Sequence, residues 1–246
     1  MTRCRIHPQT EHPPADKLEA VAKLPSTIVS DQLERFGLVR GVRQITRDEL
    51  GIMAGPALTV RTRPGDNLII YKAIQLARPG DILVVDAGGA DDRAVMGEIV
   101  VKHAAAQGII GMVIDGCIRD GAEIAAREVP VFARGYAHPG PYKDGPGEIR
   151  GPIAVGGTVV RNGDIVVGDA DGVAVVPVER LDEVIEGGLD SLSREGTAIA
   201  QAESGQMDTS WVDDRLDIIY VDGAEASSGQ AADDAGSSGE VAYPKL

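Results

Sequence analysis

The sequence predicts an α/β domain built from parallel strands with crossover helices, followed by a section of short β-strands. Two nearly all-apolar runs, residues 81–86 (DILVVD) and 109–115 (IIGMVID), are typical of strands that are buried on both faces of a sheet. Between them, residues 97–107 have the spacing of a helix, which Gly108 ends. A strand, a helix and a strand in this order predict parallel strands with a right-handed crossover.

Shorter patterns define the elements before residue 81. Residues 1–25 are polar and contain several prolines, so we expect an N-terminal extension, with the domain itself at residues 26–220. Ser26 and Thr27 can cap the start of a helix, and Gly37 can end it. The elements predicted in this part are a short helix near residues 16–23, a helix at 28–36, a strand at 56–62 and a helix at 67–77.

The sequence changes character after Arg134. Residues 135–157 are rich in loop-forming residues, and residues 221–246 are rich in Gly, Ala, Ser and Asp, which predicts a disordered acidic tail. The elements predicted after residue 115 are a loop at 116–121, a short helix at 122–128, strands at 131–133, 158–160, 164–167 and 172–176, and a helix from residue 179 towards 202.

Composition and charge exclude several classes of protein. The 246-residue chain has 24 basic and 38 acidic side chains and a net charge of −14, whereas a nucleic-acid-binding face has to be basic. No stretch approaches the roughly 20 apolar residues that a membrane helix needs, and the polar N-terminus does not resemble a signal peptide. Two cysteines, Cys4 and Cys117, are too few for a disulfide scaffold. We therefore expect a cytoplasmic protein without a nucleic-acid or membrane partner.

The residues that could carry chemistry follow two of the predicted strands. Gly97 begins a helix, and the free N–H groups of a helix start favour a small anion such as a carboxylate. Arg119 can hold a carboxylate through two hydrogen bonds, and Asp120 offers a hard oxygen ligand for Mg²⁺ or Mn²⁺. Glu98 could hold the water molecules of such an ion. On spacing alone, a surface Arg–Asp pair and a helix-starting Glu remain an alternative interpretation.

The segment from Glu98 to Arg119-Asp120 resembles the divalent-metal pyruvate aldolases, which cleave 4-hydroxy-4-methyl-2-oxoglutarate and 4-carboxy-4-hydroxy-2-oxoadipate. The same family contains the RraA-like regulators of ribonuclease activity. The resemblance covers roughly residues 25 to 200 and is carried by four blocks: ILVVDAGGADDRAVMGE, GIIGMVIDGCIRD, IRGPIAVGGTVVRNGD and VVGDADGVAVVP. It implies a swivelling β/β/α domain, assembled as a homotrimer or homohexamer with sites between subunits.

The resemblance also implies roles for individual residues. Arg119 would bind the carboxylate or keto oxygen of a 2-keto acid, and Asp120 would be the ligand of a divalent cation, Mg²⁺ or Mn²⁺. Glu195 is the candidate for a glutamate that a neighbouring subunit's C-terminal helix contributes to the site. The family more often has Asp at the position of Glu98, and the extra methylene of Glu keeps the charge but changes its reach toward the water molecules of the cation. The backbone expected to cradle the substrate is that of Gly97, Glu98, Ile99 and Val100.

These roles predict a reaction and leave alternatives. Cleavage of a carbon–carbon bond beside a 2-keto acid leaves an enolate, which a metal stabilises as a Lewis acid. The same enolate forms when oxaloacetate loses CO₂, so we expect oxaloacetate decarboxylase side activity. The competing function is a non-catalytic regulator that binds a ribonuclease complex. That branch typically lacks the two acidic residues retained here as Glu98 and Asp120, which favours the enzyme. A different hydroxy- or keto-acid substrate is a third alternative, with specificity in the loop at residues 138–150.

Overall fold

The computed structural model describes residues 1–47 and 50–219. The chain divides into two compact units, Met1–Leu192 and Ser193–Leu246, and each is described by itself. The predicted disordered tail at residues 221–246 lies outside the described residues. Within the described ranges, no helix has the length and apolar character needed to cross a membrane.

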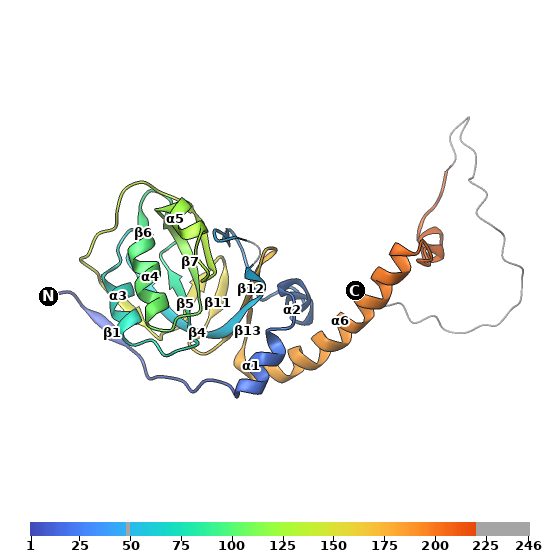
Figure 1. The fold of residues 1–246 in the computed structure, drawn as a ribbon, viewed down its shortest axis with the longest axis horizontal. Coiled ribbons are helices and arrows are strands. Elements are labelled where there is room, and N and C mark those ends of the chain that lie inside the picture. The colour runs from blue at the N-terminus through green and yellow to red at the C-terminus, as the bar shows by residue number, and fades with distance from the viewer. Residues whose placement is uncertain (48–49, 220–246) are drawn as a thin grey trace, which may run out of the picture. The chain divides into compact units, whose positions relative to one another are not determined.

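The first unit is built on a large mixed sheet (Figure 1). Its strands lie in the order β2 (Leu38–Val39), β13 (Gly172–Val176), β12 (Ile165–Asp169), β4 (Met53–Thr62), β5 (Ile82–Asp86), β7 (Gly111–Ile118), β8 (Val131–Tyr136) and β3 (Arg43–Gln44). The four strands β4, β5, β7 and β8 are parallel neighbours, as the apolar runs predict. This arrangement confirms the predicted α/β fold class.

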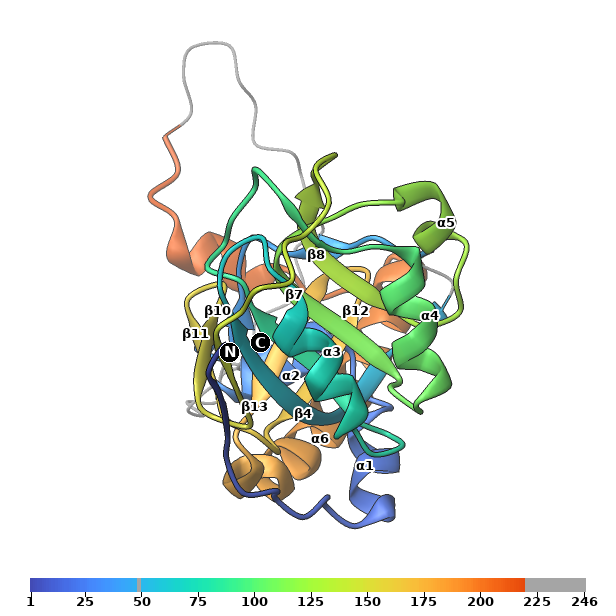
Figure 2. The same ribbon diagram turned by 90° about the vertical axis from the view of Figure 1, so that its left-hand side faces the viewer.

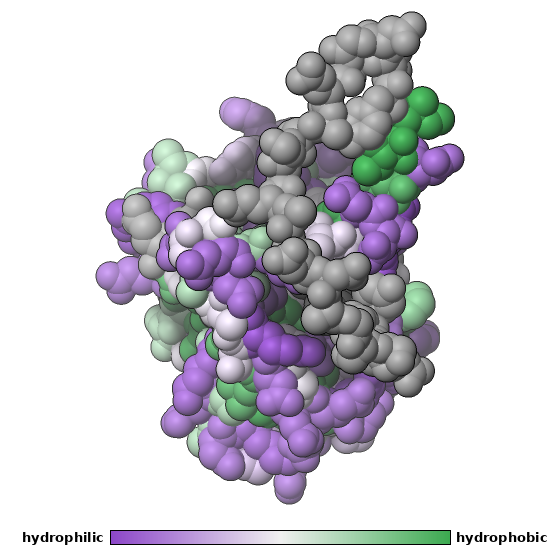
Figure 3. All heavy atoms as spheres, turned by 90° about the vertical axis from the view of Figure 1, so that its right-hand side faces the viewer, coloured by the Kyte–Doolittle hydropathy of each residue, from purple (hydrophilic) through white to green (hydrophobic). Residues whose placement is uncertain are grey.

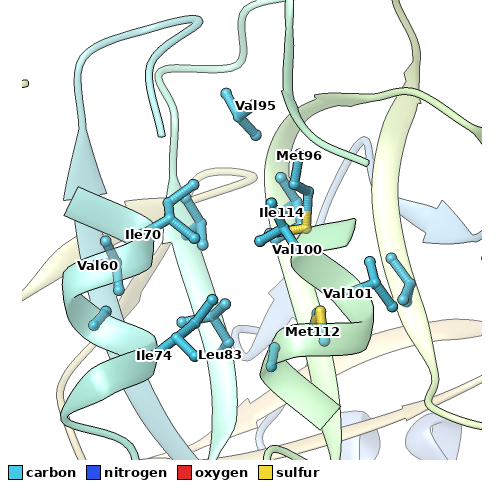
Figure 4. Close-up of a cluster of buried hydrophobic side chains, with 14 of the residues drawn as sticks. Val60, Ile70, Ile74, Leu83, Val95, Met96, Val100, Val101, Met112 and Ile114 are labelled. Atoms are coloured by element: carbon cyan, nitrogen blue, oxygen red, sulfur yellow. The ribbon is translucent and has the colours of Figure 1, made fainter. Parts of the chain in front are cut away.

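Two helices cover one face of the parallel strands. They are α3 (Leu68–Gln75), which follows β4, and α4 (Glu98–Ala106), which leads into β7. Figure 4 shows side chains from both helices pointing at side chains of the strands, with Ile70 and Ile74 on α3 and Val100 on α4. All three side chains are buried, because the apolar positions of each helix recur on the side that faces the sheet.

A β section covers the opposite face. The strand β4 belongs to both parts, since residues from Ala57 onward pair with β5 while Met53 to Pro56 pair with β12. The hairpin of β10 (Ile153–Val155) and β11 (Thr158–Val160) contributes to a second apolar cluster with Val84 and Phe132 (Figure 2). Helices, parallel strands and β section therefore form the successive layers of the unit.

The remaining elements complete the sheet edges and the helical cover. The helix α1 (Ala15–Val21), the helix α2 (Ser26–Gln32) and the start of α6 (Leu181–Glu203) pack on β12 and β13 in a third apolar cluster. The other elements are β1 (Cys4–Ile6), β6 (Ala94–Met96), the helix α5 (Gly121–Ala125), β9 (Gly147–Ile149) and two 3₁₀ turns at Val178–Arg180 and Ser210–Arg215. Among the residues that Figure 3 colours, hydrophilic ones predominate on the face shown, as expected for a strongly charged chain.

The predicted loop at residues 116–121 is wrong for its first half. The strand β7 continues through Gly116 and Cys117 to Ile118, because β6 pairs with it in parallel from Ala94 to Met96. The short apolar run of β6 carries too few residues to signal a strand by itself. Residues 4–6, within the predicted N-terminal extension, form β1, which pairs with β9.

A fully buried carboxylate joins the start of α3 to the segment that follows β8. Asp66 accepts hydrogen bonds from the backbone N–H groups of Leu68 at 2.9 Å, Asp144 at 2.8 Å and Gly145 at 3.0 Å. The guanidinium of Arg63 lies 3.1 Å from the same carboxylate. Without Asp66, these backbone donors lose their acceptor, which is costly at buried positions.

We therefore predict that Asp66→Ala lowers the free energy of unfolding by about 3 kcal/mol, because it removes the acceptor of one buried and two part-buried backbone donors and the buried partner of Arg63. Urea denaturation measures the change. Asp144→Ala is the matched control, since its side chain also approaches Arg63, at 3.7 Å, but is 73% exposed. The control should cost less than about 0.5 kcal/mol. Equal costs for the two variants would contradict this role of Asp66.

Candidate active site at the ends of β6 and β7

The two candidate loops begin side by side because β6 and β7 are parallel neighbours. The backbone N–H of Arg119 donates to the carbonyl of Met96 at 3.0 Å, which extends the pairing past the end of β7. Gly97 and Glu98 follow β6, and Arg119 and Asp120 follow β7. The carboxyl ends of parallel strands are where ligands usually bind in α/β proteins.

Asp120 lies directly against the turn at Gly97. Its Oδ2 accepts a hydrogen bond from the backbone N–H of Glu98 at 3.0 Å. A Cβ atom placed on Gly97 would lie 2.2 Å from this Oδ2 and 3.0 Å from Cγ of Arg119. The backbone of Gly97 is extended (φ −146°), so the glycine is required for space and not for its conformation.

The conformation of Asp120 is itself unusual. Its backbone is in the left-handed region (φ 59°, ψ 46°), where few residues other than glycine occur and where Asp and Asn are the most tolerant. The turn presents the carboxylate at the surface with 38% of the side chain exposed, beside Arg119, which is 45% exposed. The Nε atom of Arg119 lies 3.8 Å from Oδ2 of Asp120. The guanidinium of Arg119 and the carboxylate of Asp120 therefore lie close together, and both are accessible to solvent.

Arg119 and Asp120 line an open concavity of about 690 Å³. Its wall is formed largely by small residues of α5 and of the segment after β8: Gly121, Ala122, Ala125 and Ala137. Tyr136 and His138 complete it. The size and openness suit a small, charged molecule that enters from solvent.

The side chain of Glu98 is held by two cations. Its carboxylate contacts Nζ of Lys102 at 2.9 Å and the guanidinium of Arg127. The hydrogen bond from Lys102, with the neighbouring charge of Arg127, holds the pKa of Glu98 below its ordinary value. Glu98 is therefore a carboxylate at neutral pH. Its backbone N–H contacts Asp120 while its side chain contacts α4 and the segment after α5.

The structure separates the roles of Ile99 and Val100. The Ile99 side chain is 72% exposed at the first turn of α4, whereas Val100 is buried in the core. The backbone N–H of Val100 donates to the carbonyl of Gly97 at 3.1 Å. Four residues are predicted to bind a ligand through their backbone. In two of them, Glu98 and Val100, the backbone N–H already donates a hydrogen bond to an acceptor within the chain.

Glu195 belongs to the second unit. It lies on the part of α6 beyond Leu192, with an exposed side chain. The structure brings Gly97, Glu98, Arg119 and Asp120 together, and the role of Glu195 stays a prediction.

Sequence reasoning assigned no site role to Lys102, Arg127 or Tyr136, and it included His138 only as the first residue of the loop at 138–150. The contact of Lys102 with Glu98 can be predicted from the sequence, because the two residues lie one helical turn apart on α4. Arg127, Tyr136 and His138 reach the site only because α5 and β8 pack beside β7, and their local sequence carries no motif.

The donor set fits a hard cation that keeps much of its water. Among residues 1–47 and 50–219, no three His, Cys, Asp or Glu side chains converge as a metal cage. Mg²⁺ and Mn²⁺ need no cage, because one or two carboxylates together with substrate and water oxygens complete their coordination. Asp120 supplies one such oxygen donor, in a place that a Cβ atom at Gly97 would fill.

Comparisons with known proteins agree with this fold. The RraA-like family (Aldolase/RraA) matches residues 26–175. A relative from Halalkalibacterium halodurans, named "Putative 4-hydroxy-4-methyl-2-oxoglutarate aldolase", is 40% identical over 164 residues, which cover 66% of this chain and 77% of the relative.

Two solved structures extend the similarity to the fold. Streptomyces coelicolor RraAS2, described as an unusual member of the RNase ES inhibitor RraA protein family, has a TM-score of 0.69 at 26% identity and covers 76% of this chain and 98% of its own. The RNA-processing inhibitor RraA from Thermus thermophilis has a TM-score of 0.57 at 27% identity, with 62% of this chain and 92% of its own covered. The family match spans more than half of the sequence and includes every residue from Gly97 to Asp120, and the chain belongs to the RraA-like family.

Proposed function

We propose that this protein is a divalent-metal-dependent aldolase that cleaves 2-keto acids of the 4-hydroxy-4-methyl-2-oxoglutarate type to pyruvate. The observation that carries the proposal is the juxtaposition of Arg119 and Asp120 in one open concavity beside the start of α4. A relative with an aldolase name supports the same reaction class.

Arg119 is suited to bind the 2-keto acid end of the substrate. Its guanidinium is permanently charged and planar, so it can hold a carboxylate or a keto oxygen through paired hydrogen bonds. The start of α4 lies beside it and carries the positive end of the helix dipole, which favours a negative group. As the bond breaks, the same guanidinium stabilises the charge that develops on the keto oxygen.

Asp120 would hold the divalent cation, Mg²⁺ or Mn²⁺. When bound, the cation supplies Lewis-acid stabilisation of the enolate charge. The contact with the Glu98 N–H orients the Asp120 carboxylate, and the left-handed turn keeps it at the surface of the concavity. The substrate can therefore reach Asp120 without rearrangement of the sheet.

The reaction also needs a group that takes the proton of the C4 hydroxyl. The C3–C4 bond then breaks, its electron pair forms the enolate of pyruvate, and C4 becomes the carbonyl of the second product. Glu98 is ionised, but its lowered pKa makes it a weak base. We assign it the orientation of a water molecule that accepts the proton. Glu195 of a neighbouring subunit in a trimer or hexamer is the second candidate.

The same residues would also serve the decarboxylation of oxaloacetate. Loss of CO₂ breaks the C3–C4 bond and leaves the same enolate, so Arg119 has the same charge to stabilise. We therefore include this reaction as a side activity of the proposed aldolase.

A regulator of ribonuclease activity is the second candidate function. Two structural neighbours favour it, one described as an RNA-processing inhibitor and one as an unusual member of the RNase ES inhibitor RraA protein family, because they share the fold over most of their length. A binding protein, however, has no need of a carboxylate and a guanidinium at the end of β7 in an accessible concavity. The two functions differ in whether the purified protein turns over a 2-keto acid.

We predict metal-dependent pyruvate release from 4-hydroxy-4-methyl-2-oxoglutarate and from oxaloacetate. A coupled lactate dehydrogenase assay with Mg²⁺, Mn²⁺ or EDTA measures it. Release should stop in EDTA and return with excess Mg²⁺, because the enolate loses and regains its Lewis acid. Pyruvate added in EDTA controls for the coupling enzyme, and a blank without the protein corrects for spontaneous decarboxylation. Release that persists in EDTA, or none from either substrate, would contradict the proposal.

Asp120→Asn should lower kcat by at least about 100-fold, because it removes the charge that holds the cation. Asn tolerates the left-handed conformation and keeps an acceptor for the Glu98 N–H, so the thermal unfolding curve should stay unchanged. Asp92→Asn, at an exposed position outside the lining of the concavity, is the matched control. Activity of the Asp120 variant equal to that of the control would rule out this role.

A further inference from the structure

The concavity of Arg119 and Asp120 has a second group of polar side chains. Tyr136 ends β8 and is 54% exposed, and His138 follows it in an exposed position. The Tyr136 ring packs against Gly121, where a Cβ atom would lie 2.3 Å from Cε1. The position of the Tyr136 ring therefore requires a residue without a side chain at Gly121, directly after Asp120.

Backbone hydrogen bonds fix this segment against the ends of β6 and β7. The N–H of Ala137 donates to the carbonyl of Ile118 at 2.9 Å, and the N–H of Ala94 donates to the carbonyl of Pro139 at 3.1 Å. A Cβ atom on Gly140 would lie 2.6 Å from a terminal nitrogen of Arg119. The segment that carries Tyr136 and His138 thus runs past the Arg119 guanidinium at Gly140, and both side chains line the same concavity as Arg119.

Hydrogen-bond donors are few in the lining. Apart from Arg119, the only side chains there that carry an N–H or O–H donor are those of Tyr136 and His138, within the part of the chain that the structure describes. The other lining residues, apart from Asp120, are glycine or alanine. A phenol hydroxyl donates one hydrogen bond, and an imidazole donates at least one in either charge state.

A substrate of the proposed class carries a carboxylate at each end. Arg119 and Asp120 are committed to the 2-keto acid end, so the second carboxylate needs donors elsewhere in the concavity. We propose that Tyr136 and His138 form the subsite for this distal carboxylate, and that the site thereby selects 4-hydroxy-2-oxo diacids over the corresponding monoacids. The inference rests on the proposed function and deepens it.

The proposed subsite predicts a preference for one substrate over another that has the same bond to be cleaved, so binding at the subsite can be tested apart from the cleavage step. In 4-hydroxy-4-methyl-2-oxopentanoate a methyl group replaces the distal carboxylate, and the bond to be cleaved is unchanged. Tyr136→Phe and His138→Gln should each lower the ratio of kcat/KM for the diacid to that for the monoacid by about 10-fold, mainly through KM of the diacid. Tyr142→Phe and His103→Gln are the matched controls, since neither residue lines the concavity, and they should leave the ratio unchanged.

A binding measurement without turnover tests the same subsite. The probes are 2-oxoglutarate and 2-oxopentanoate, which lack the C4 hydroxyl, titrated calorimetrically into the full chain with Mg²⁺. The two variants should weaken binding of 2-oxoglutarate about 10-fold and change that of 2-oxopentanoate less than about two-fold. Equal weakening of both probes, or unchanged binding of 2-oxoglutarate, would overturn the subsite. A wild-type protein that binds 2-oxoglutarate through these residues but cleaves neither hydroxy acid would support the subsite and contradict the aldolase.

Discussion

The site depends on one close approach, between the carboxylate of Asp120 and the backbone at Gly97. The two residues belong to different loops, and they meet because β6 and β7 pair in parallel up to their carboxyl ends. Only a residue without a side chain leaves room for Oδ2 of Asp120 at this turn. The left-handed conformation of Asp120 then directs the chain into α5 and away from the sheet.

The rest of the unit keeps these two loops in place. The strand β7 is fully buried between its neighbours, and α4 packs its apolar side on the parallel strands, so both loops start from rigid elements. Glu98 links the start of α4 to the chain that follows β7 twice, through its N–H to Asp120 and through its carboxylate to Arg127 beyond α5. The segment of Tyr136 and His138 joins from β8, and the buried Asp66 fixes its continuation to α3. The functional side chains lie on loops, and the buried strands and helices from which these loops start hold them in position.

Much of this fold follows from local sequence, and most of the site does not. The apolar runs of β5 and β7 and the pattern of α4 identify a parallel sheet because such strands are buried on both faces. The strand β6 has only three residues, so its pairing, and with it the length of β7, depends on tertiary contacts. Arg119 and Asp120 are visible as a motif, whereas Arg127, Tyr136 and His138 come close only through packing of α5 and β8. The space that Gly97 leaves for Asp120 likewise depends on how two loops meet, so the sequence of either loop alone does not predict it.

The affinity of Gly97→Ala for Mn²⁺, measured by electron paramagnetic resonance, tests the central claim most directly. The added methyl group occupies the place of the Asp120 carboxylate, so we predict that the folded variant binds Mn²⁺ at least about 10-fold more weakly than the wild type. Gly196→Ala is the control, because a Cβ atom there meets no neighbour within 4 Å. A Gly97 variant that binds Mn²⁺ as tightly as the Gly196 variant would contradict the account, since the carboxylate held against Gly97 would then not be the ligand of the cation.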